Sequence, residues 1–99
     1  MYKFPVYWTD KLKADFLQRV ILIHSYLYYE TDKVIWSDKK YDEVSKQLVS
    51  LQNNYKDINK TQYGYVFSDY DGTTGFDLYH RLNKKDKEQI KRIAWSIVK

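Results

Sequence analysis

Residues 10–53 of this chain read DKLKADFLQRVILIHSYLYYETDKVIWSDKKYDEVSKQLVSLQN, and this stretch decides the fold. In its first half, apolar side chains recur at steps of three and four residues, the spacing that places them on one side of an α-helix. They are Leu12, Phe16, Val20, Ile23 and Leu27, and Leu17, Ile21 and Leu22 widen the stripe. Because Thr9 or Asp10 can cap the first turn, we predict a helix from Asp10 to about Glu30.

The second half of the stretch predicts another helix. Ser37 is a good N-cap, and the charge of Asp38 favours the positive end of the helix dipole. The apolar positions that follow are Tyr41, Val44, Leu48 and Leu51. We expect this helix to end near Asn53. With residues 31–36 as a short connector, the two helices should pack as an antiparallel hairpin.

After Tyr55 the pattern changes. Tyr63, Tyr65 and Phe67 alternate with smaller residues, which is the period of a β-strand, and Asp71-Gly72 predicts a turn. Residues 76–79 would then return as a second strand. Asn83 can cap a last helix whose apolar stripe is Ile90, Ile93, Ala94 and Ile97.

The expected fold is therefore α+β and mainly helical, in one domain over residues 1–99. It consists of a helical hairpin (10–53), a β-hairpin region (54–82) and a C-terminal helix (83–99), with residues 1–8 as an extended arm. The chain has no cysteine, which excludes disulfides and cysteine-based zinc sites. The sequence contains neither a signal pattern nor an apolar run of membrane-spanning length, so a cytoplasmic protein without membrane contact is expected.

Residues 26–44 read YLYYETDKVIWSDKKYDEV, and this segment resembles the N-terminal subdomain of bacterial NAD-dependent DNA ligases. In that family an aromatic pair is followed by an aspartate and then by an Asp-x-x-Tyr-Asp element. Tyr28 and Tyr29 match the pair, Asp32 matches the intermediate aspartate, and the element corresponds to Asp38, Tyr41 and Asp42. The resemblance covers roughly residues 16–51 and includes both predicted helices.

The ligase subdomain closes over NAD and contacts its nicotinamide mononucleotide (NMN) half. The resemblance therefore implies that NMN or NAD is a ligand here, held by Tyr28, Tyr29, Asp38, Tyr41 and Asp42. Tyrosine rings can attract the flat nicotinamide cation, and carboxylates can accept hydrogen bonds from ribose hydroxyls. Structural roles are also open to these residues. Tyr41 lies on the apolar stripe, Asp38 can serve as a helix-terminal charge, and Tyr28 can pack between the helices.

The resemblance stops before the chemistry of the ligases, whose catalytic lysine stands in a Lys-x-Asp-Gly motif. The corresponding stretch here is Asp69-Tyr70-Asp71-Gly72, and an aspartate cannot become adenylated. We therefore expect no catalytic residue and no enzyme activity. Asp69, Asp71, Asp77 and His80 lie close in sequence, but acidic turns are far commoner than metal sites, so no metal site is expected.

Three functions fit the sequence. The first is a non-catalytic module that binds NMN or NAD. The second is a phage or mobile-element accessory protein that inhibits a host or defence enzyme, of CRISPR type for example, by protein–protein binding, for which 11 tyrosines would supply contacts. The third is a nucleic-acid accessory protein. Its contacts with nucleic acid, or with an acidic partner, would come from four residues of the last helix, Lys84, Lys87, Lys91 and Arg92. The modest net charge of +4 counts against nucleic acid as the primary partner.

Overall fold

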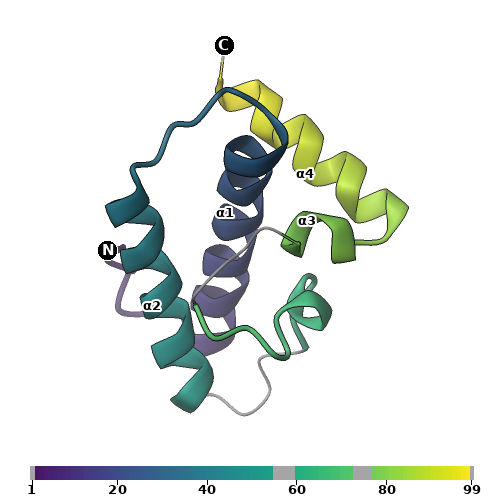
Figure 1. The fold of residues 1–99 in the computed structure, drawn as a ribbon. Coiled ribbons are helices and arrows are strands. Elements are labelled where there is room, and N and C mark those ends of the chain that lie inside the picture. The colour runs from purple at the N-terminus through teal and green to yellow at the C-terminus, as the bar shows by residue number, and fades with distance from the viewer. Residues whose placement is uncertain (1, 55–59, 73–76, 99) are drawn as a thin grey trace.

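The long N-terminal helix lies at the centre of the protein. The computed structural model describes residues 2–54, 60–72 and 77–98. Helix α1 spans Asp10–Glu30, and the Thr9 side chain accepts a hydrogen bond from the Leu12 amide, so both predicted ends are confirmed. Helices α2, α3 and α4 all pack against α1 (Figure 1). Since α1 has neighbours on several sides, its most deeply buried side chains include Ala14, Leu17 and Ile21, whereas Leu12 is half exposed.

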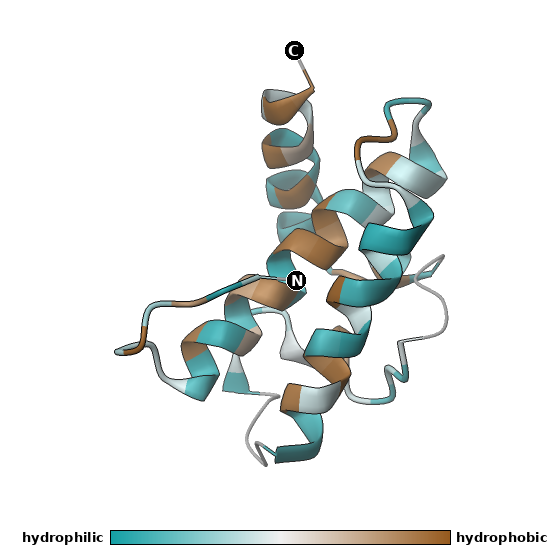
Figure 2. Ribbon diagram, turned by 90° about the vertical axis from the view of Figure 1, so that its left-hand side faces the viewer, coloured by the Kyte–Doolittle hydropathy of each residue, from teal (hydrophilic) through white to brown (hydrophobic). Residues whose placement is uncertain are grey.

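The predicted helical hairpin is present. Helix α2 spans Asp38–Asn54 and runs antiparallel to α1 (Figure 1). The Ser37 hydroxyl accepts a hydrogen bond from the Lys40 amide, which confirms Ser37 as the cap. Val44 and Leu48 are fully buried on the side that meets α1. The hydropathy colouring shows that the remaining surface of α2 is largely hydrophilic (Figure 2).

The predicted β-hairpin is wrong for the residues that the structure describes. Residues 60–72 fold as consecutive tight turns around the short 3₁₀ helix η2, Gly64–Val66. Tyr63, Val66 and Phe67 are buried while Tyr65 is exposed, so burial follows a period of three to four residues rather than two. The bonds from Val66 N to Tyr63 O and from Phe67 N to Gly64 O link residues three apart, which is 3₁₀ geometry.

The expected return strand is also replaced by helix. Residue 76 lies outside the described residues, and the remainder of that segment leads into α3, Leu78–Arg81. Leu78 and Leu82 are buried four residues apart, which is helical spacing. Asp71-Gly72 does form a bend, and Gly72 has a φ of +84°. The other predicted positions of the 54–82 region that fall on 55–59 and 73–76 lie outside the described residues.

The C-terminal helix α4 spans Lys84–Ile97, and the Asn83 side chain accepts a hydrogen bond from the Asp86 amide at 2.8 Å, as predicted. Ile90 and Ala94 are buried against the core. Ile97 is half exposed, so the apolar stripe of α4 is shorter than predicted, because the end of the helix extends beyond α1 (Figure 1).

The N-terminal arm packs on the body through aromatic contacts. Tyr2, Phe4 and Trp8 all lie against Phe16 of α1, with ring centroids 4.8, 5.7 and 6.0 Å from it. Gln47 of α2 holds the arm through bonds to both backbone polar groups of Tyr2. Within the described part of the chain, no helix combines the length and apolar character needed to cross a membrane.

Candidate functional site

The connector between α1 and α2 sets the geometry of the tyrosine–aspartate segment. The Thr31 hydroxyl donates to the Leu27 carbonyl at 2.7 Å and accepts from the Lys33 amide at 3.0 Å, so one side chain ends α1 and begins the turn. Trp36 is buried at the other end of the connector. Its indole stacks on His24 of α1, with centroids 3.7 Å apart. These contacts bring the end of α1 close to the start of α2.

Tyr28 and Asp38 meet across this connector. The Tyr28 hydroxyl lies near the Asp38 carboxylate, whose negative charge raises the pKa of Tyr28. The ring of Tyr29 lies edge-on to that of Tyr28, with centroids 4.8 Å apart. Both tyrosines are 42% exposed, so their rings are accessible from solvent. Tyr28, Tyr29 and Asp38 thus form an exposed aromatic and acidic surface, which we call the Tyr28 surface.

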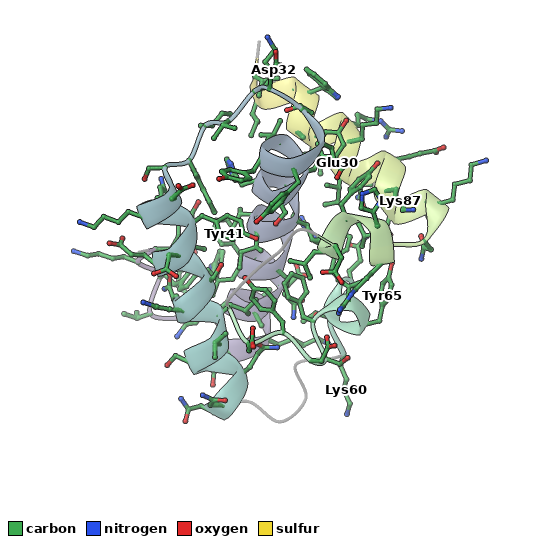
Figure 3. The ribbon with its side chains drawn as sticks, in the orientation of Figure 1. Glu30, Asp32, Tyr41, Lys60, Tyr65 and Lys87 are labelled. Carbon is green, nitrogen blue, oxygen red and sulfur yellow. The ribbon has the colours of Figure 1, made fainter. Side chains whose placement is uncertain are left out.

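Tyr41 lies beneath this surface. Its side chain points from α2 towards α1 (Figure 3), and its hydroxyl is 2.5 Å from the Ser25 hydroxyl. The Tyr70 hydroxyl lies nearby and donates to Ser45 at 2.7 Å. Burial raises the pKa of Tyr41 well above its ordinary value. Tyr41 therefore occupies the half-buried position that the apolar stripe of α2 predicts.

Asp42 and Asp32 make separate surface contacts. Asp42 is exposed, and its carboxylate forms an ion pair with Lys46 at 3.0 Å, one turn further along α2. Asp32 lies at the end of the connector that is remote from Tyr41 (Figure 3) and is 3.9 Å from the Lys33 ammonium. Of the five predicted ligand contacts, three thus form the Tyr28 surface, Tyr41 lies beneath it, and Asp42 lies beside it on α2.

Sequence reasoning missed the residues that hold Tyr41 in place. Ser25 and Ser45 are almost fully buried, and Tyr70 comes from the segment in which a strand was expected. The only signal in the sequence is the serine on each helix within the apolar pattern, since a buried hydroxyl needs a polar partner. Nothing in the local sequence around Tyr70 indicates that it would be this partner.

The acidic residues after η2 bind one arginine. Arg81 is 2.6 Å from the Asp69 carboxylate and 2.9 Å from that of Asp77. His80 pairs instead with Glu30 at the end of α1, at 2.9 Å. Among residues 2–54, 60–72 and 77–98, no three histidine or acidic side chains come together as metal ligands would.

The cations predicted on the last helix have two environments. Lys84, Lys91 and Arg92 are exposed on α4. Lys87 is partly buried on the side of α4 towards α3 (Figure 3), where its ammonium lies 6.0 Å from the centroid of the Tyr79 ring. Lys85 is exposed as well, although it was not among the predicted contacts.

Grooves formed by described residues lie away from the Tyr28 surface. One of about 380 Å³ is bordered by Phe4, Leu17 and Lys46, among others. Another of about 310 Å³ lies along α4.

Comparisons of the chain with protein-family models, with curated proteins and with solved structures gave no match.

Proposed function

We propose that the protein is a non-catalytic module that binds nicotinamide mononucleotide, free or as part of NAD, at the Tyr28 surface. The observation that carries this proposal is the closeness of Tyr28 to Asp38, which places an exposed aromatic pair beside a carboxylate. The same residues carry the resemblance to the mononucleotide-binding subdomain of the ligases. The helical hairpin supports this reading, since the resembling segment spans both of its helices.

The chemistry of the Tyr28 surface suits a flat cation with hydroxyl groups. Oxidised nicotinamide carries a positive charge, and an exposed tyrosine face attracts such a ring by about 0.5–1 kcal/mol. The Asp38 carboxylate adds charge complementarity and accepts hydrogen bonds from ribose hydroxyls. Tyr41, anchored by Ser25, supports the surface from below. A few contacts of this size correspond to a Kd in the micromolar to millimolar range, by order of magnitude.

Ligand titrations followed by amide chemical shifts test the proposal. NMN and NAD should shift the amides of residues 28–42, whereas AMP, which lacks nicotinamide, should not. Reduced NMN should bind about twofold to fivefold more weakly, because its ring is uncharged. Asp38→Asn and Tyr29→Leu should each weaken NMN binding by at least a similar factor.

Two exposed residues of the same types serve as matched controls. Asp10→Asn and Tyr7→Leu lie outside the Tyr28 surface and should leave NMN binding unchanged. The proposal fails if millimolar NMN produces no response. It also fails if the response of Asp38→Asn equals that of the original chain.

A second candidate function is inhibition of a host or defence enzyme by surface binding. The observation that favours it is the connector that leads from Tyr29 to Asp38, on which Val34 and Ile35 are 51% and 50% exposed. The hydropathy colouring shows this hydrophobic stretch on the surface (Figure 2). Exposed apolar side chains next to tyrosines are typical of protein-binding surfaces.

Affinity purification with paired variants tests this second function. A stoichiometric partner should bind the original chain and be lost from the Val34→Asp, Ile35→Asp double variant. Val6→Asp, which changes an exposed valine of the N-terminal arm, should retain the partner. Recovery of the same proteins with all three chains would count against a binding surface at the connector.

A further inference from the structure

The outer side of α4 carries a set of cations that form no ion pair with the residues that the structure describes. Lys84, Lys85, Lys91 and Arg92 are all exposed. Within residues 2–54, 60–72 and 77–98, the ion pairs involve other cations, such as Lys13, Lys46 and Arg81. In Figure 1, α4 lies along one edge of the molecule, and none of the described helices lies over its outer side. This side of α4 is therefore open to a partner of opposite charge.

The positions of these cations favour an extended partner. Lys84 and Lys91 are seven residues apart, and so are Lys85 and Arg92, which places the members of each pair two helical turns, or roughly 10 Å, from each other. Glu88 is the one carboxylate on this side. The other acidic residue of the helix, Asp86, is buried and accepts a hydrogen bond from Tyr65 at 2.7 Å. Positive charge therefore dominates along the outer side of the helix.

A groove runs beside one of these cation pairs. Lys85, Glu88, Gln89 and Arg92 border it together with Gln62, and its volume is about 310 Å³. The side-chain oxygen Oε1 of Gln89 accepts hydrogen bonds from the Tyr63 hydroxyl at 2.6 Å and from Nε2 of Gln62 at 2.7 Å, so Nε2 of Gln89 is available as a donor. A groove with two cations and an amide donor suits phosphate groups.

An aromatic ring stands at the end of the cationic side. Trp95 is 41% exposed, and it follows Lys91 by four residues and Arg92 by three, so it shares their side of α4. Its indole nitrogen donates to the Tyr26 hydroxyl at 3.0 Å, which fixes the ring while part of it remains exposed. A fixed indole next to cations offers a stacking surface for a nucleobase.

We infer that the outer side of α4 binds single-stranded nucleic acid, with Lys84, Lys85, Lys91 and Arg92 on the phosphates and Trp95 against a base. An acidic peptide would use the cations but would gain less from an oriented indole. Paired bases in a duplex would not be accessible to that indole. This surface is on a different helix from the Tyr28 surface, so the inference does not depend on nucleotide binding there.

Fluorescence anisotropy with a labelled oligothymidylate tests the inference. Binding should weaken between about 50 and 200 mM salt, because phosphate contacts release counterions. The variant Lys85→Gln, Lys91→Gln, Arg92→Gln should lower the slope of log affinity against log salt by about two, at roughly 0.7 per lost contact. Trp95→Leu should weaken binding by about fivefold or more and leave that slope unchanged. Trp95→Phe keeps an aromatic ring and should retain part of the affinity.

A charge-matched control separates this surface from general attraction. The variant Lys13→Gln, Lys33→Gln, Lys46→Gln removes three cations that already lie near carboxylates, and it should keep the original slope. Absence of binding at 50 mM salt overturns the inference. Equal losses in the two triple variants, or full affinity in both Trp95 variants, overturn it as well. Competition by polyglutamate as strong as that by unlabelled oligonucleotide would assign the surface to acidic peptides instead.

Discussion

The imidazole of His24 lies flat against the indole of Trp36, with ring centroids 3.7 Å apart and an angle of 9° between the planes. The ammonium of Lys40 lies 5.5 Å from the centroid of the same indole, so Trp36 has a cation near it in addition to the imidazole. This contact joins α1 to the connector. It explains how a short segment without regular structure holds the start of α2 in place.

The protein should lose stability on mild acidification because of His24. Burial and the nearby charge of Lys40 lower the pKa of His24 from 6.5 to about 4. Between these values the unfolded chain binds a proton that the folded chain does not. The free energy of unfolding should therefore fall as the pH drops from 6.5 to 4, by roughly 2 kcal/mol after allowance for the partial exposure of the ring.

Urea denaturation across this pH range measures the effect. His24→Phe keeps a flat ring against Trp36 and should reduce the acid-dependent loss by about the amount attributed to His24. His80→Gln, at an exposed histidine, should keep that loss. An unchanged pH dependence in His24→Phe would contradict the assignment.

The hydroxyl of Tyr41 should contribute to stability through Ser25. Tyr41→Phe would leave the buried Ser25 hydroxyl without this partner, and an unsatisfied buried polar group costs about 1–3 kcal/mol. Because the Tyr41 and Tyr70 hydroxyls lie close enough to interact, the loss in the double variant Tyr41→Phe, Tyr70→Phe should differ from the sum of the single losses. Denaturant titration gives the free energies of unfolding of the original chain, the two single variants and the double variant. Tyr7→Phe, at an exposed tyrosine, should change nothing, and strictly additive losses would show that the two hydroxyls act independently.

Replacement of Gly72 should be costly for two reasons. Its φ of +84° lies in the left-handed region, where a side chain costs about 1–2 kcal/mol. A Cβ atom there would also lie 3.1 Å from Cγ2 of Val49. Gly72→Ala should therefore lower the thermal midpoint clearly. In a Val49→Ala background the crowding disappears. Gly72→Ala should therefore lower the thermal midpoint by less there, but it should still lower it. Equal costs in the two backgrounds would show that crowding by Val49 plays no part.

The cap of α4 should stabilise the protein measurably. The Asn83 side chain accepts a hydrogen bond from the Asp86 amide at 2.8 Å, and loss of such a cap typically costs about 1 kcal/mol of stability. Asn83→Ala should show this loss of unfolding free energy in chemical denaturation, whereas Asn83→Gly should lose only a few tenths of a kcal/mol. An Asn83→Ala variant as stable as the original chain would mean that water replaces the cap without cost.

Helix positions were predictable because their causes are local. Thr9, Ser37 and Asn83 each cap the helix that follows by bonding to an amide three residues ahead, which the sequence shows directly. Periodic apolar residues then locate the side of the helix that is buried. The juxtaposition of Tyr28 with Asp38 depends on a connector of ordinary length, which explains why local patterns could anticipate it.

The segment 60–72 was mispredicted because its pattern is ambiguous at short length. Alternating aromatics at Tyr63, Tyr65 and Phe67 satisfy the strand period, yet Val66 between them is buried and Tyr65 is exposed. No partner strand is available among the described residues. The helical core instead offers positions to Tyr63, Val66 and Phe67, so packing against α1 and its neighbours overrides the local preference.

The sequence by itself determined the three long helices, their caps and the pairing of α1 with α2, because hydrogen bonding and burial along a helix depend on neighbours within four residues. Only the tertiary structure decided that Ser25 and Tyr70 are the neighbours of the Tyr41 hydroxyl, and that the outer side of α4 presents Lys85 rather than Lys87. Those outcomes depend on which residues far apart in the chain fill the same space, and no local pattern encodes that choice.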